Sequence, residues 1–193
     1  MTATIDPTII NERVASPPAR LSLTPAGSAP GLLDGAWWPR SRDLLRELPA
    51  LMDALDARWG RITRITVNPA RWPVIPRKVP VAGHTVHVGW FADEQDPHKL
   101  ILLSYTTGRW DLMVIPPETG AAAAARLMSA AATPGGLTAS GLMASDDTTR
   151  VARETLSREE EWETDGGAAS AGALNPTGPL NPVRGMRMTH AFS

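Results

Sequence analysis

The clearest pattern in the chain is a stripe of apolar residues at spacings of three and four. It predicts a helix after residue 41, because this spacing gathers apolar side chains on one helix face. The stripe consists of Leu44, Leu45, Leu48, Leu51, Met52, Leu55 and Trp59. Ser41 is a suitable N-cap, Asp43 falls in the first turn, and Gly60 ends the helix. Pro49 predicts either a kink or the start of a second helical segment.

Segments with alternating or β-branched residues predict strands on both sides of this helix. They are residues 20–24, 36–40, 62–68, 78–82, 84–91, 100–106 and 110–115. Short turns at Gly83 and at residues 107–109 predict two hairpins. Residues 71–77 contain two prolines and predict a loop or an edge. Two further prolines end the series, and the alanine-rich segment 118–132 predicts a second helix.

Hairpins followed by a helix, with one long helix inserted early, predict an α+β fold. We expect a mostly antiparallel sheet of five or six strands, with both helices packed on one face. The domain organisation has four parts. They are a disordered N-terminal segment (1–18), a single α+β domain (19–133), a linker with a marginal helix (134–164) and a disordered tail rich in Pro, Gly and Ala (165–193). The marginal helix is expected within residues 146–162 and has little apolar content.

Three blocks between residues 20 and 132 carry a resemblance to a known family. They are DGAWWPRSRDLLRELPALMDALDARWG (34–60), VGWF (88–91) and RWDLMVIPP (109–117). These blocks resemble the actinobacterial domain-of-unknown-function family numbered five nine nine four. The resemblance implies a small cytoplasmic bacterial protein, and it supplies no activity, cofactor or catalytic residue.

Composition narrows the chemistry. The chain of 193 residues has no cysteine, which excludes disulfides, thiolate catalysis and Cys-ligated metals. Its formal net charge of -1 does not indicate a partner. No secretory signal, lipidation motif or membrane-spanning apolar segment is evident, so we expect a cytoplasmic protein without membrane contact.

The remaining polar motifs argue against a metal or cofactor. His84 and His87 form an H-x-x-H pair, but in a strand residues three apart point to opposite faces. His98 follows a run of acids that is typical of a solvated turn. Phosphate-loop and serine-hydrolase motifs are missing. Asp111 is either a surface acid paired with Arg109, which we favour, or an inward-facing acid with a perturbed pKa. We therefore expect no metal and no cofactor, and we lean against an enzyme.

Tryptophan and charge are unevenly distributed. The chain has 7 Trp against 2 Phe and 1 Tyr, and no acid occurs between Asp56 and Asp93. The interval Arg58–Lys78 is therefore predicted to form a ligand-facing surface, with Trp72 stacking on the ligand. The candidate binding residues are Trp37, Trp38, Arg40, Arg58, Arg61, Arg64, Arg71, Trp72, Arg77 and Lys78. They predict a non-catalytic binding or regulatory module for an anionic ligand or nucleic acid.

Three alternatives stay open at this point. Trp59 and Trp90 fit core positions, and the arginines can be a solvated face. The chain can instead be a protein-interaction adaptor that binds a partner through residues 146–182. An enzyme of unrecognised type is the third reading, and it lacks any motif of its own.

Overall fold

The computed structural model describes residues 17–91, 96–105 and 108–166, with side chains of the last helix described as far as Trp162. Nearly all of the two terminal segments predicted to be disordered lie outside these residues. The chain divides into two compact units, Met1–Val151 and Ala152–Ser193.

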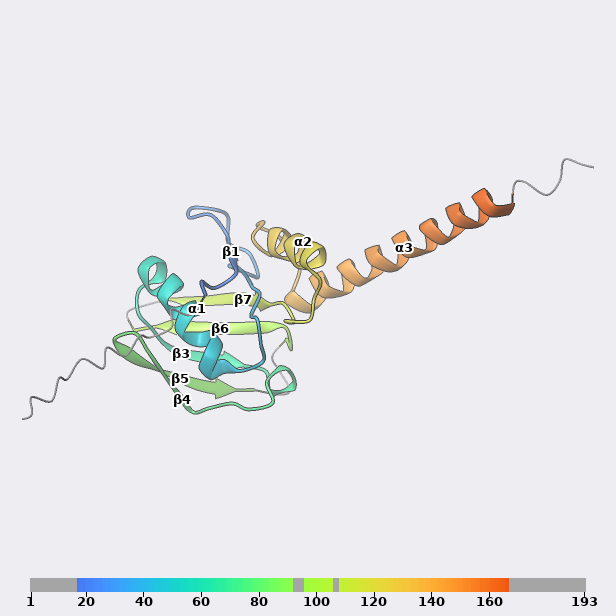
Figure 1. Cartoon of the computed structure of the whole chain (residues 1–193). Coiled ribbons are helices and arrows are strands. Elements are labelled where there is room, and N and C mark those ends of the chain that lie inside the picture. Colours follow the sequence, from blue (N-terminus) through green and yellow to red (C-terminus); the bar gives the residue numbers. More distant parts are fainter. Residues whose placement is uncertain (1–16, 92–95, 106–107, 167–193) are drawn as a thin grey trace, which may run out of the picture. The chain divides into compact units, whose positions relative to one another are not determined.

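The first unit is built on one mixed sheet of seven strands in the order β1-β2-β7-β6-β3-β5-β4 (Figure 1). The strands are β1 (Leu21–Leu23), β2 (Gly35–Trp37), β3 (Ile62–Val67), β4 (Lys78–Val81), β5 (His84–Trp90), β6 (Lys99–Ser104) and β7 (Arg109–Val114). The α+β class is confirmed, and each predicted strand segment contributes one strand. The sheet is nevertheless larger than the expected five or six strands, because even the three-residue strands β1 and β2 join it.

The strand pairing departs from the mostly antiparallel expectation at two places. β2 pairs with β7 and β3 pairs with β5 in parallel, while the other four neighbouring pairs are antiparallel. Between β3 and β5 the chain makes a 3-10 turn, η1 (Pro69–Arg71), and the edge strand β4. Because of this connection, β5 runs beside β3 in the same direction. The residues of a single turn do not predict a pairing of this kind.

The predicted amphipathic helix is α1 (Leu44–Trp59), which covers one face of the sheet (Figure 1). Its apolar stripe forms the main core with the inward residues of the strands; the helix contributes Leu44, Leu48, Leu51, Met52 and Leu55. The N-cap is Asp43 rather than Ser41, because the Asp43 carboxylate accepts the Leu45 N–H at 2.9 Å. Pro49 lies inside one continuous helix.

The second predicted helix, α2 (Ala121–Ala131), packs on the opposite face together with the start of α3 (Ala139–Gly166). The expectation that the first two helices share one face is therefore wrong. Strand residues explain the arrangement: Leu112 and Val114 belong to the α1 core, whereas Met113 and Ile115 belong to the α2 core. A continuous apolar run of this kind supplies side chains to both faces of a sheet.

The second unit begins within α3, which is helical to Gly166. Among its described residues, Leu156 and Trp162 have exposed apolar side chains, and Trp162 reaches 81%. Within the described residues, every helix is too short or too polar to cross a bilayer.

Candidate functional site

The two tryptophans at the centre of the predicted surface are core residues. Trp37 is 1% exposed and Trp72 is 4% exposed, and their rings stack with centroids 5.7 Å apart. The interpretation of Trp72 as a ligand-stacking residue is therefore wrong. The Asn68 side chain caps η1 by accepting the Ala70 N–H at 2.9 Å, and the turn that follows directs Trp72 inward onto Trp37. The prolines of this segment predicted a loop or an edge but not the direction of this indole.

The other tryptophans divide between packed and exposed positions. Trp38 is covered by the Arg20 guanidinium, whose carbon lies 3.4 Å from the ring centroid. Trp59 stacks on Trp110 with centroids 4.9 Å apart and packs against the main core. Trp90 is half-exposed, so the expectation of a core position fails for this residue. Trp37, Trp38 and Trp72 were predicted to lie on the ligand-facing surface, and they do not form an exposed cluster there.

Basic residues do come together on the face of the sheet opposite α1. Strand pairing places Lys78 beside His87, His87 beside Arg64, and Arg64 beside Leu103, which in turn pairs with Arg109. Paired residues of neighbouring strands project from the same face, about 5 Å apart. Their strand neighbours Val79, Val86, Ile65 and Leu102 are buried in the α1 core, so the row faces away from that helix. We call Lys78, His87 and Arg64 the basic row.

The basic row is accessible, and within the described part of the chain its two strong cations have no acidic partner. Lys78, His87 and Arg64 are all exposed. Across residues 17–91, 96–105 and 108–166, no carboxylate forms a salt bridge with Lys78, Arg64 or Arg61. Uncompensated cations of this kind attract anions more strongly than paired ones.

Beyond this row, Asp111 on β7 is held by two cations. The Asp111 carboxylate accepts from Lys99 Nζ at 3.0 Å and from Arg109 Nε at 3.0 Å. Asp111 is therefore the ion-paired residue that we favoured, on the same face as the basic row but not within it. Among the described residues, Lys78 on β4 and Arg64 on β3 form no such pair with a carboxylate.

Two exposed aromatic rings lie at opposite ends of β3. Tyr105 is 83% exposed, and its backbone N–H donates to the Arg61 carbonyl at 3.2 Å at the start of the strand. Phe91 is also exposed, and its N–H donates to the Val67 carbonyl at 3.3 Å at the other end. Side chains alternate between the two faces of a sheet along a strand. Tyr105 therefore lies on the same face as Leu103, and Phe91 lies on the same face as His87. Both rings are therefore placed on the face that carries the basic row.

The remaining predicted site residues lie elsewhere. Arg58 is in the last turn of α1, on the helix that covers the other face. Arg40 is exposed and donates to the Pro18 carbonyl at 2.9 Å. Arg77 is exposed beside the sheet edge, where its carbonyl accepts the Val88 N–H. The structure thus brings Arg64 and Lys78 into one row, places Arg61 at the start of β3, and separates the others. Sequence reasoning missed His87 and Tyr105, whose signal is alternation within a strand followed by cross-strand register.

A second polar cluster surrounds the one buried histidine among the described residues. His98 is 7% exposed, and its Nε2 contacts the Arg71 guanidinium. This contact requires an unprotonated acceptor nitrogen, so the ring is neutral. Burial lowers the pKa of His98, and the charges of Arg71 and Arg42 lower it further, while a backbone hydrogen bond with Val114 and the Asp96 carboxylate act in the opposite direction.

This environment predicts a stability that depends on pH. Because the folded-state pKa of His98 lies below the value of about 6.5 in an unfolded chain, the unfolded state takes up the proton first as pH falls. The contribution to stability is complete above about pH 6.5 and is lost progressively below it. The urea midpoint should therefore fall between pH 7.5 and 5.5, and His98→Asn should reduce this fall. An unchanged pH dependence in His98→Asn would contradict the assignment, and exposed His87→Gln is the matched control.

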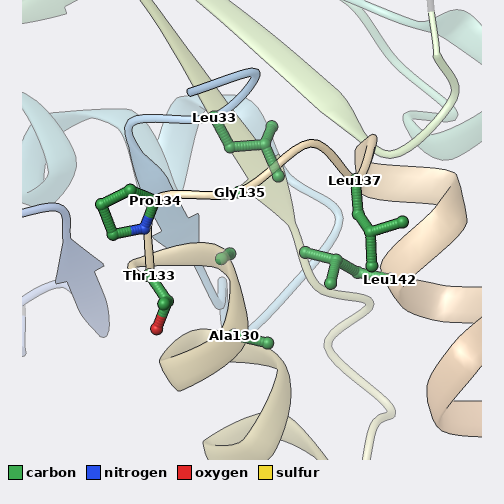
Figure 2. A pocket seen from close by; sticks show the side chains of 8 residues that line it. Leu33, Ala130, Thr133, Pro134, Gly135, Leu137 and Leu142 are labelled. Carbon is green, nitrogen blue, oxygen red and sulfur yellow. The ribbon is translucent and has the colours of Figure 1, made fainter. Parts of the chain in front are cut away.

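An apolar pocket lies where α2 approaches the start of α3 (Figure 2). Its volume is about 300 Å³, and it is lined by Leu33, Ala130, Ala131, Thr133, Pro134, Gly135, Leu137 and Leu142. The Thr133 hydroxyl already donates to the Ser129 carbonyl at 2.9 Å. With no ionisable side chain in its lining, this pocket suits an apolar group and not an anion.

Comparisons with known proteins identify a family but not a function. A model of a family of unknown function, DUF5994, matches residues 20–131, which is more than half of the chain. Neither the curated proteins nor the solved structures contain a match to the chain. The matched region holds the whole sheet together with α1 and α2.

Proposed function

We propose that this chain, which belongs to DUF5994, a family of unknown function, is a binding module for an anionic ligand. The ligand binds on the sheet face opposite α1, over β4, β5 and β3 and away from the strands that α2 covers, and we call this part the open face. One observation carries the proposal. Three neighbouring strands place Lys78, His87 and Arg64 in a single exposed row, facing away from α1. Lys and Arg side chains in such a row can follow a chain of phosphates.

Single-stranded nucleic acid is the ligand class that fits this face best. Exposed aromatic rings let unpaired bases stack without sequence preference, and Tyr105 and Phe91 are placed for this at the two ends of β3. Between them Gly89 pairs with Thr66 in the register of β5 and β3. A flat, basic, aromatic surface suits splayed single strands better than the groove of a duplex.

The proposal predicts binding with a defined salt dependence. Labelled single-stranded DNA or RNA should bind the full chain at low salt, as measured by fluorescence anisotropy. For single strands the logarithm of the association constant falls with the logarithm of salt by about 0.7 per phosphate neutralised. Three cations, Lys78, Arg64 and Arg61, therefore predict a slope of about -2.

The competitors in this experiment decide the ligand class. Heparin should compete for the same face through charge alone, and a duplex of equal length should bind more weakly than the single strand. If no polyanion binds at low salt, the basic row is only a solvated face. In that event the adaptor hypothesis for residues 146–182, which the exposed Leu156 and Trp162 support, takes its place.

A further inference from the structure

Two arginines outside the open face converge on a small cavity. Arg42 and Arg71 line it, together with Pro39, Trp72, Val114, Pro116 and Pro117. Its volume is about 10 Å³, which is close to the space that one water molecule needs. The cavity is thus too small for a ligand as it stands, and it lies beside Arg42 and Arg71.

A carboxylate of the protein itself already binds at this position. Glu118 Oε1 accepts from Arg42 Nη2 at 2.5 Å, and Arg42 Nη1 donates to the Arg71 carbonyl at 2.9 Å. Burial raises the pKa of Glu118, but its own backbone N–H and the Arg42 guanidinium outweigh that effect, so its pKa is lowered and it stays ionised. The Glu118 side chain is 63% exposed, so it can leave without disturbing the core.

One donor of this cluster is buried without an acceptor. Arg71 Nε has no hydrogen-bond partner among the described residues. Buried donors are normally satisfied, and an unsatisfied one is destabilising. Together, Arg42 and Arg71 therefore carry more donors than the Glu118 carboxylate accepts.

We propose that Arg42 and Arg71 form a binding site for a phosphate group, either inorganic phosphate or a phosphomonoester, and that Glu118 is an internal competitor at this site. A phosphate dianion matches two guanidinium charges and offers more acceptor oxygens than the single carboxylate. Binding displaces the Glu118 carboxylate, and the phosphate oxygens take its hydrogen bond from Arg42. The inference is independent of the open face, which uses other residues.

Removing the competing charge should strengthen binding. We expect the full-length Glu118→Gln protein to bind inorganic phosphate roughly 1.4- to fivefold more tightly than the native chain, because an exposed ion pair contributes about 0.2–1 kcal/mol. Isothermal titration at constant ionic strength, with chloride as the balancing salt, measures this ratio. Arg42→Gln introduced into the Glu118→Gln protein should abolish the gain, and so should Arg71→Gln if that variant remains folded.

A nucleoside 5′-monophosphate provides the second arm of the experiment. If it binds as inorganic phosphate does, the site takes a phosphomonoester, and if only inorganic phosphate binds, the site takes the free ion. Arg46→Gln/Arg153→Gln, at two exposed arginines outside both surfaces, should leave either affinity unchanged, which excludes an effect of net charge. The inference is overturned if Glu118→Gln binds phosphate no better than the native chain, or if the Arg42→Gln protein retains the affinity.

Discussion

Trp72→Ala should lower the free energy of unfolding by about 3–5 kcal/mol, the cost typical of truncating a large buried aromatic residue. The indole is 4% exposed and stacks on Trp37, so its removal leaves a cavity in the main core. Equilibrium unfolding in urea, followed by circular dichroism, measures the loss.

A tryptophan on the surface provides the matched control for this experiment. Trp162→Ala removes an indole that is 81% exposed, and it should change stability by no more than about 0.5 kcal/mol. A Trp72→Ala protein as stable as the native chain would show that Trp72 is not part of the core. Under conditions in which Trp72→Ala stays folded, its affinity for polyanions should match that of the native chain.

Reversing the charge of the basic row should have the largest effect on binding. Arg64→Glu/Lys78→Glu places two acids where phosphates are expected, and we predict a loss of about tenfold or more in affinity for single-stranded DNA at low salt. The salt slope should become shallower by about 1.4, because two phosphate contacts disappear. Both side chains are exposed, so the variant should remain folded.

The control must change the charge equally at another place. Arg46→Glu/Arg153→Glu makes the same substitution at two exposed helix positions, one on α1 and one on α3. We expect it to retain most of the affinity, apart from the effect of net charge. An equal loss in both double variants would mean that overall charge, and not the open face, determines binding.

Local sequence patterns predicted the helices and strands of this fold well, but they did not predict which of them lie side by side. The apolar stripe predicted α1, and alternation predicted the strands, because both depend on residues a few positions apart. The face on which α2 packs depends on β2 lying beside β7, and this parallel pair joins residues more than seventy positions apart. The uninterrupted run Leu112–Ile115 was the available sign that both faces are covered there.

The candidate surface depends on long-range pairing in the same way. The absence of acids between Asp56 and Asp93 drew attention to Arg61, Arg64 and Lys78, which are exposed, and their role in binding stays a prediction. Composition along the chain cannot distinguish them from Arg71, which the capped turn η1 directs toward His98. The pairing of Arg64 with His87 arises from the parallel register of β3 and β5. Register of this kind follows from the whole sheet and not from any short segment.

The most direct test of the open face is a map of where the ligand binds. Amide spectra of the ¹⁵N-labelled chain should be recorded while a short single-stranded oligothymidylate is added at low salt. The account predicts that signals of Lys78, His87, Arg64 and Tyr105 shift with one common affinity, while those of α1 stay in place. It is contradicted if the shifts concentrate on α1 or on residues 71–77, or if no signal moves.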